Sequence, residues 1–361
     1  MATPTLDTPP EATAAPRETA SRGRLAGLGG TLIIVGAGII YATIGPFGRT
    51  TGLIKVPGVL VGLAALYLAV RSLGRAVWGG GFDAGFWLSV VWLVLLLAAA
   101  IAADQLPLSN YDEPAKTLSE LGYETPNLLS AHPLGTNGQA LDLLGQAIYA
   151  ARVSILISFC AVTISVLFGG AIGLLAGYFR GKLDLVIGTL TDASLSVPGL
   201  VLLIALASVL GVPGSVGEAI VKEGGALAVV SIPTMIRLTR PHAISIAQRE
   251  FVAASRTLGT KHRRILFYDV LPNVIPPVAA FAFVMLAILI VVEGSLSFLG
   301  LGLQQPIPTW GNMIAEADLQ VLSQHPTVAL VPGGFMLLTV LSLNRIGERA
   351  RRFWDVAEEK I

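Results

Sequence analysis

The sequence predicts an all-α protein that crosses a membrane about eight times, and two observations carry the prediction. Of the 361 residues, 53% are hydrophobic and only 13% are charged, with a mean hydropathy of +0.73; this composition argues against a soluble chain. Apolar segments of about 20 residues also recur, which is the length that a helix needs to cross the hydrocarbon core of a membrane. The core offers the backbone no hydrogen-bond partner, so such segments must be helical. The predicted spans are 28–45, 56–73, 86–103, 153–177, 184–211, 226–244, 274–299 and 327–346.

Residues 1–80 are expected to precede the main membrane domain, which is predicted at 86–350. Residues 1–24 are rich in Thr, Ala and Pro and lack the apolar content to fold alone, so they predict a disordered cytoplasmic tail. The apolar stretch that follows has no convincing cleavage site and is succeeded by further spans, which indicates a retained anchor and not a signal peptide. Residues 25–80 thus predict two N-terminal transmembrane helices.

Basic residues fix the expected orientation, because loops rich in Lys and Arg tend to stay in the cytoplasm. With both termini cytoplasmic, including a tail at 351–361, most Lys and Arg residues fall on the inner side. The basic residues left outside are Arg49, Lys55, Lys116, Arg152 and Lys222. The long external loop 104–146 is acidic and offers a docking surface, although each of its residues is more simply a solvated connection. Nothing in the charge pattern favours nucleic acid.

One cytoplasmic loop, 240–272, carries a specific pattern. Glu250, Ala253 and Ala254 occupy neighbouring positions on one face of a predicted short helix, and Gly259 can adopt the backbone angles that end it. Two alanines permit close approach of a partner surface. The alternative is an amphipathic helix whose basic residues, Lys261, Arg263 and Arg264, rest on anionic lipid.

The order of residues in this loop resembles the EAA loop of ABC importer permeases. The loop reads Glu250-Phe-Val-Ala253-Ala254-Ser-Arg-Thr-Leu258-Gly259, followed by Val270-Leu271-Pro272-Asn273. Further segments resemble the dipeptide, oligopeptide and nickel importer family, and its C-type permease in particular. They are His132-Pro-Leu-Gly-Thr-Asn137, Tyr149-Ala-Ala-Arg152-Val-Ser154, Asp192-Ala-Ser-Leu-Ser196-Val-Pro198-Gly199, Glu293-Gly-Ser-Leu-Ser297-Phe-Leu-Gly300-Leu-Gly302 and Pro308-Thr-Trp310-Gly311-Asn312.

The resemblance implies a type I permease fold, with six family spans in 86–350 preceded by two extra helices, in a prokaryotic plasma (inner) membrane. It implies a second homologous permease subunit, two cytoplasmic ATPase subunits that hold ATP and Mg, and an extracytoplasmic binding protein that delivers a peptide. The chain itself would bind no cofactor and no metal. Its ATPase-coupling residues would be Glu250, Ala253, Ala254, Gly259, Leu271 and Pro272.

Two departures from the family pattern are visible. Ala140-Leu141-Asp142 stands where relatives usually show Gly-Arg-Asp, so the role of that arginine does not carry over. Asp269 occupies a position that is usually Ile in the EAA loop.

Four residues are candidates for the transport pathway or a subunit interface: Asp192, Pro198, Glu293 and Ser297. Asp192 and Glu293 lie in apolar stretches, where an ionisable side chain usually faces a cavity or a partner; each can instead sit near an interface, satisfied by backbone or water. Gly169, Gly173 and Gly177 recur every four residues and predict close helix packing.

Three alternatives stay open at this stage. The cargo can be nickel or another small solute instead of a peptide. A stand-alone secondary transporter coupled to ions through Asp192 and Glu293 predicts inverted repeats, which are not evident. A membrane enzyme is disfavoured, because the chain lacks a Gly-x-x-x-x-Gly-Lys-Ser/Thr nucleotide loop, a His-Glu-x-x-His pair and a Gly-x-Ser-x-Gly elbow.

Overall fold

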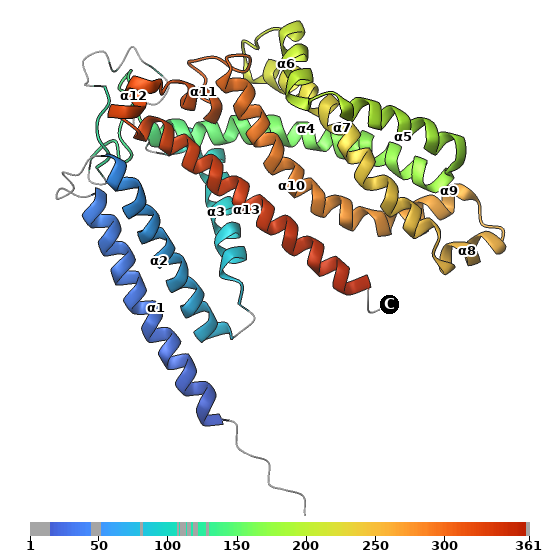
Figure 1. Cartoon of the computed structure of the whole chain (residues 1–361), viewed down its shortest axis with the longest axis horizontal. Helices are drawn as coiled ribbons and strands as arrows, with labels where there is room; N and C mark the ends of the chain where they lie inside the picture. Colours follow the sequence, from blue (N-terminus) through green and yellow to red (C-terminus); the bar gives the residue numbers. More distant parts are fainter. Residues whose placement is uncertain are drawn as a thin grey trace, which may run out of the picture. The chain divides into compact units, whose positions relative to one another are not determined.

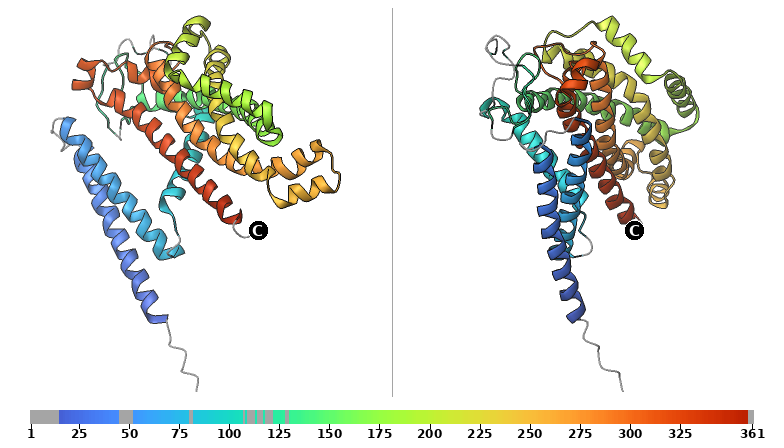
Figure 2. Two further views of the ribbon diagram at one scale, coloured as in Figure 1. Left: turned by 45° about the vertical axis from the view of Figure 1, so that its right-hand side comes forward. Right: turned by 60° about the vertical axis from the view of Figure 1, so that its left-hand side comes forward.

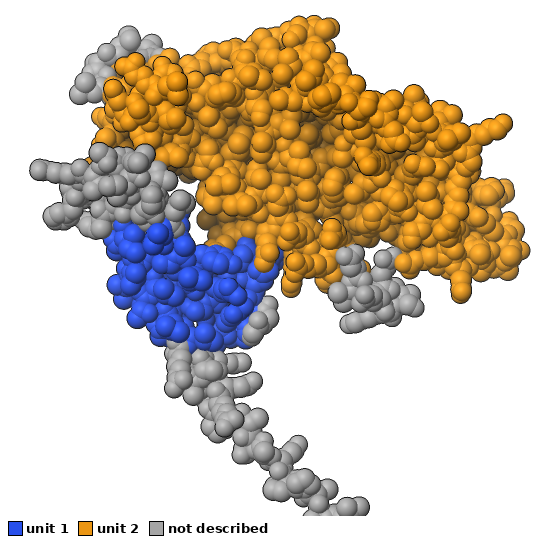
Figure 3. Space-filling view, viewed as in Figure 1, with its two compact units in different colours: residues 1–87 blue, residues 88–361 orange. Residues whose placement is uncertain are grey.

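The computed structural model describes residues 15–44, 52–79, 82–106, 108, 113, 117, 122–127 and 130–358. Every regular element in these ranges is a helix, and the one isolated β-bridge joins Thr136 to Asp142, so the all-α prediction is confirmed. The chain divides into two compact units, residues 1–87 (unit 1) and residues 88–361 (unit 2), coloured separately in Figure 3. Each unit is described by itself below.

Unit 1 is a helical hairpin of α1 (Ala15–Ile44) and α2 (Gly52–Trp78), whose two helices pack against each other. Glycine permits the close approach: a Cβ at Gly36 would lie 2.9 Å from the carbonyl oxygen of Gly62. Because α1 begins at Ala15, residues 15–24 of the predicted disordered tail are helical. Helix formers such as Ala and Arg extend the apolar helix backwards. Residues 1–14 lie outside the described part.

Unit 2 contains the remaining helices, and the boundary between the units falls within α3. In chain order they are α3 (Ala84–Ile101), η1 (Ala103–Gln105), α4 (Leu143–Phe179), α5 (Gly181–Ser196), α6 (Gly199–Leu210), α7 (Val216–Ala247), α8 (Glu250–Thr257), α9 (His262–Arg264), the π-helical turn η3 (Ile265–Val270), α10 (Leu271–Phe298), α11 (Trp310–Ala315), α12 (Leu319–Gln324) and α13 (Thr327–Glu358) (Figure 1).

Six of the described helices are long and apolar enough to cross a membrane: Val61–Trp78, Ala84–Ile101, Leu143–Phe179, Val216–Ala247, His262–Phe298 and Thr327–Trp354. Within α1, Leu25–Ile39 is a further apolar helical segment, and the helix itself continues to Ile44. The predicted span 184–211 is not one helix: α5 and α6 meet at an angle of 84°. Pro198 stands at the break, where a proline restricts its predecessor to an extended conformation. The predicted cytoplasmic tail 351–361 is helical as far as Glu358, where α13 ends.

The three glycines of α4 lie against α7, as predicted. A Cβ added at Gly169, Gly173 or Gly177 would come within 2.8, 2.9 and 2.6 Å, respectively, of a carbonyl oxygen of α7. The three contacts advance along both helices together, so α4 and α7 run parallel. A parallel pair requires the chain to return between them, which makes the bent pair α5–α6 a single return crossing.

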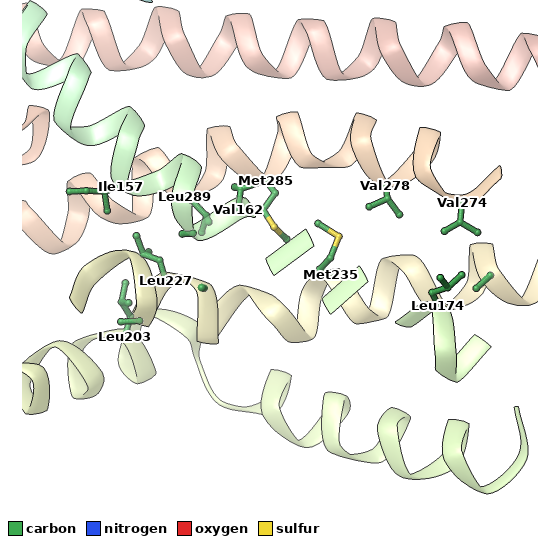
Figure 4. Close-up of a cluster of buried hydrophobic side chains, with 14 of the residues drawn as sticks. Ile157, Val162, Leu174, Leu203, Leu227, Met235, Val274, Val278, Met285 and Leu289 are labelled. Atoms are coloured by element: carbon green, nitrogen blue, oxygen red, sulfur yellow. The ribbon is translucent and has the colours of Figure 1, made fainter. Parts of the chain in front are cut away.

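Buried side chains hold α4, α7 and α10 together. Figure 4 shows Ile157 and Val162 of α4, Leu227 of α7, and Met285 and Leu289 of α10 meeting in one apolar cluster. A second cluster brings α3 and α13 against the start of α4 through Leu96, Leu343 and Ala147. Views from two further directions show α10 between α7 and α13 (Figure 2). These clusters give unit 2 its own core.

Candidate coupling helix and membrane-interior residues

The short helix α8 presents the predicted coupling residues on an exposed face. Glu250, Ala253 and Ala254 are exposed, whereas Val252 on the opposite side is fully buried. Glu250 lies in the first turn of α8, where a negative charge is favourable beside the free N–H groups of the helix. The predicted face therefore exists and is open to a partner.

Gly259 ends α8 as predicted. Its φ of +75° is left-handed, its N–H donates to Arg256 O at 3.0 Å, and the next N–H, of Thr260, donates to Ser255 O at 3.1 Å. This pair of bonds is the Schellman motif, which normally needs glycine. The turn leaves Leu258 85% exposed at the tip of the helix.

The loop is braced against the end of α4 by contacts that the sequence did not reveal. The hydroxyl of Tyr178 lies 2.9 Å from Nδ1 of His262, and the Arg256 guanidinium lies 5.4 Å from the centre of the Tyr178 ring. Tyr178 is remote in sequence and belongs to an apolar span, so no local pattern points to its role. These contacts, with buried Val252, tie α8 to the ends of the long helices.

Leu271 and Pro272, the predicted anchors of the loop's exit, lie in the first turn of α10. The loop's second helix does not stop before them, because α9, η3 and α10 run on as one helical stretch, His262–Phe298. Pro272 therefore lies inside this stretch, where it supplies no N–H donor, and the π-helical turn η3 stands directly before α10. Leu271 is half-buried and Pro272 exposed.

Beside the coupling helix, the exposed side chains Arg263, Arg264, Phe267 and Tyr268 line a surface hollow of about 480 Å³. Arg263 and Arg264 belong to the basic run noted in the sequence. Phe267 and Tyr268 are 57% and 77% exposed. Large aromatic side chains exposed this far are typical of a contact surface.

The four candidate pathway residues fall into two separate places. Asp192 is exposed on α5, and Pro198 begins α6 at the bend. Glu293 and Ser297 are buried in α10, where the Ser297 hydroxyl donates to Glu293 Oε1 at 2.9 Å. Only the latter pair is brought into contact.

Two further polar groups within the spans were missed. Arg240 of α7 binds Asp184 of α5 through its Nε and, at 2.8 Å, through Nη2, which ties the returning helix to the α4–α7 pair. Glu223 of α7 is 2% exposed. Its position near the start of a predicted span would have been a signal, because an ionisable side chain in an apolar stretch is costly.

The segment before α4 is organised by its own polar side chains. Asp142 caps α4 by accepting from the Gly145 N–H at 2.8 Å, and Asn137 Oδ1 accepts from the Leu141 N–H at 3.0 Å. Burial raises the pKa of the Asp142 carboxyl, although the Gly145 N–H and His132 act in the opposite direction. Ala140 takes a left-handed φ of 57°, at the position where the resemblance has Gly.

The late segment that resembles the family also builds structure. Thr309 and Asn312 form a capping box at α11. The Asn312 amide further donates to Ile307 O at 2.9 Å, and the fully buried Trp310 donates its indole N–H to Ala147 O at 3.0 Å. These residues fasten the turn after α10 onto α4.

Several helices long and apolar enough to cross a membrane, with a braced, exposed short helix between two of them, are the architecture of a multi-pass membrane protein. The family model described as "Binding-protein-dependent transport system inner membrane component" matches residues 169–353. The chain belongs to this family.

Named relatives cover most of the chain. It is 33% identical over 268 residues to the dipeptide transport system permease protein DppC of Alkalihalophilus pseudofirmus, spanning 74% of this chain and 85% of the relative. It is 38% identical over 222 residues to a di/tripeptide transport system permease protein DppC of Pseudomonas aeruginosa, spanning 62% and 71%. Identity to the glutathione transport system permease protein GsiD of Pectobacterium atrosepticum is 32% over 263 residues, spanning 73% and 84%.

Proposed function

We propose that this chain is the permease subunit of an ATP-driven importer that carries short peptides delivered by an extracytoplasmic binding protein. The exposed face of α8 is the observation that carries the proposal, because it is an open helical surface held to α4 by the contacts of Tyr178. The names of its relatives, which include dipeptide, di/tripeptide and glutathione transport permeases, favour a peptide cargo. Nickel and other small solutes are the less favoured cargoes.

The coupling step follows from how α8 is held. A cytoplasmic ATPase subunit docks on Glu250, Ala253 and Ala254, where the two small side chains allow close contact. Tyr178 connects the loop to α4 through His262 and Arg256, so a displacement of α8 moves the long helices as rigid bodies. ATP and Mg are handled by the ATPase subunits and not by this chain.

In the assembled importer, the chain pairs with a second permease subunit, with both termini and α8 in the cytoplasm. ATP can shift the transporter only through different affinity for its two states. The contact at α8 therefore persists in both states, which its Schellman turn and buried Val252 favour by keeping the helix formed.

Charge inversion at the coupling face tests the proposal. We expect Glu250→Lys to abolish ATP-dependent uptake of labelled dipeptide into proteoliposomes that contain all subunits, because it reverses the charge presented to the ATPase. Glu348→Lys is the matched control, since Glu348 is an exposed glutamate on α13. Membrane insertion should be unchanged in both. Uptake by Glu250→Lys at the wild-type rate contradicts the coupling assignment.

Cross-linking tests the docking directly. Cys160 is the only cysteine, so Cys160→Ser gives a background free of thiols in this chain. We expect Ala253→Cys in that background to cross-link to an ATPase subunit, and Glu348→Cys to do so far less. Equal cross-linking from both positions, or from neither, argues against docking at α8.

A further inference from the structure

Two glutamates lie in the interior of unit 2, and the coupling role of α8 leaves them unexplained. Glu223 of α7 is 2% exposed and Glu293 of α10 is 0% exposed. Ser297 satisfies Glu293 Oε1, but Glu293 Oε2 and both carboxyl oxygens of Glu223 form no hydrogen bond of normal geometry among the described residues, and the one polar backbone group that acts on Glu223 is the Leu303 N–H in the turn after α10. Most of this buried acidic surface is therefore unsatisfied.

The two carboxyls share one neighbourhood. Glu293 is among the groups that act electrostatically on Glu223, and the Ser154 hydroxyl of α4 lies beside the Glu293 carboxyl. A Cβ at Gly224, the residue after Glu223, would lie 3.4 Å from the Ile157 carbonyl oxygen, so α7 meets α4 at this level.

A buried serine of α4 adds a further unsatisfied group. Ser158 lies one helical turn after Ser154, on the same face of α4. It is fully buried, and its hydroxyl has no partner in the described structure. We call the group Glu223, Glu293, Ser154, Ser158 and Ser297 the interior acid site.

Among the residues that the structure describes, no basic side chain neutralises the interior acid site. The helices α6, α10 and α11 contain no Lys, Arg or His. Arg152, the only basic residue of α4, binds exposed Asp104 at 2.9 Å. At the level of Glu293, α13 presents the apolar side chain of Met336, which contacts Gly294.

The basic residues of α7 are also committed elsewhere. Lys222 binds exposed Glu218 at 2.9 Å. Arg237 is exposed and lies about 20 Å further along the helix from Glu223 at 1.5 Å per residue. Arg240 binds Asp184, and His242 lies further still.

Burying an ionised carboxylate without a counter-charge is strongly unfavourable, and a second like charge nearby adds repulsion. Such a group takes up a proton instead of staying ionised. We propose that Glu223 and Glu293 form a proton-binding site that holds at least one proton at neutral pH. The proton comes from water and forms an O–H bond on one carboxyl, and the pair then carries at most one negative charge.

A proton is the cation small enough to reach these enclosed carboxyls. A metal ion or the ammonium group of a peptide needs an open approach and several ligands, whereas these carboxyls are enclosed by α4, α7 and α10 of a single chain. The bound proton therefore stabilises the packing of α4, α7 and α10, because its loss would place two negative charges between α7 and α10.

Infrared spectroscopy of the complete transporter in lipid, with ¹³C-labelled glutamate, tests this proposal without depending on transport. At neutral pH we expect a carbonyl-stretch band of protonated glutamic acid that shifts in heavy water. The double variant Glu223→Gln/Glu293→Gln should lose this band, since glutamine is close in shape to the protonated acid. Glu218→Gln, an exposed residue one turn earlier on α7, is the matched control and should keep it.

The single variants protect the test against poor assembly of the double variant. Each single variant, Glu223→Gln or Glu293→Gln, keeps one buried carboxyl and should show a band no larger than that of the wild type, which only the double variant loses. A band of equal size in all variants, or no protonated glutamic acid in the wild type, would show that both glutamates are ionised and would overturn the proposal.

Discussion

Ala140 shows how a single residue departs from its family without breaking the fold. Its φ of 57° is a left-handed conformation, which costs an L-residue with a side chain about 1 to 2 kcal/mol. Alanine has the smallest side chain after glycine, and the Gln139 and Leu141 N–H groups hold the turn by donating hydrogen bonds to Asn137 Oδ1. Asn137 and Asp142 therefore hold the segment before α4 in a chain that has Leu141 where the family pattern has arginine.

The turn makes a prediction about substitutions at Ala140. We expect Ala140→Val to lower the free energy of unfolding by about 2 kcal/mol or more, because a β-branched side chain is strained in this conformation and the site is buried. Ala140→Gly should change it little, since relief of strain offsets the lost methyl contact. Ala131→Val, at an exposed alanine of the same segment, is the control for chemical denaturation in detergent. A tolerated valine at 140 would rule out the left-handed turn.

Glu316 provides a pH-dependent prediction outside the membrane spans. It accepts hydrogen bonds from Asn137, at 3.0 Å, and from Gln305, but burial raises the pKa of its carboxyl above the ordinary 4.5. The folded protein thus binds this proton more tightly than the unfolded chain does. Stability contributed by Glu316 is present below pH 4.5 and falls as the pH rises through the raised pKa.

We therefore expect the thermal midpoint of the solubilised protein to fall with pH above 4.5 in the wild type, and to fall less in Glu316→Gln. The exposed Glu124 belongs to the segment before α4, and Glu124→Gln should retain the wild-type slope. A steeper decline in Glu316→Gln than in the wild type has the wrong sign for this account.

Among the helices, the pair α4 and α7 depends on glycine at specific turns. Gly173 has the Ile236 carbonyl oxygen 2.9 Å from where its Cβ would stand, whereas Gly170 on the same helix has nothing within 4 Å. Helices that approach this closely gain van der Waals contact that larger residues would prevent. The packing surface is a stripe and not the whole helix.

Gly173→Ala and Gly170→Ala are a matched pair of substitutions for this surface. We expect Gly173→Ala to destabilise the protein by about 1 to 3 kcal/mol, because the added methyl overlaps backbone. Gly170→Ala should be neutral or stabilise by about 0.5 to 1 kcal/mol, through the better helix propensity of alanine. The measurement is the free energy of unfolding in mixed micelles, and equal effects from both would contradict the packing stripe.

At the scale of the whole molecule, each unit has its own internal packing. The family match lies at 169–353, and both apolar clusters consist of residues from unit 2. Unit 1 has its own glycine-mediated packing between α1 and α2. The function we propose is thus located in unit 2, while the two extra helices remain without an assigned role.

Removal of residues 2–80 tests this division. We expect the shortened chain to insert in the same orientation, because two spans are removed and the side on which α3 begins is preserved. Together with its partner subunits it should retain peptide uptake within about threefold, less than 1 kcal/mol of activation free energy. Inverted topology in a cysteine-accessibility assay, or complete loss of uptake with normal insertion, would place an essential part of the transporter in unit 1.

The sequence by itself determined the features that depend on local pattern. Long apolar runs must become helices in hydrocarbon, the i, i+3 and i+4 spacing of Glu250, Ala253 and Ala254 places them on one helical face, and Gly259 ends that helix because few other residues accept its backbone angles.

Only the tertiary structure decided what depends on partners distant in the chain. It bent the span 184–211 by 84° at Pro198, braced α8 with Tyr178, and enclosed Glu223 together with Glu293. Burial, hydrogen bonding and charge repulsion are set by which side chains meet, and residues 70 positions apart meet only after the helices pack.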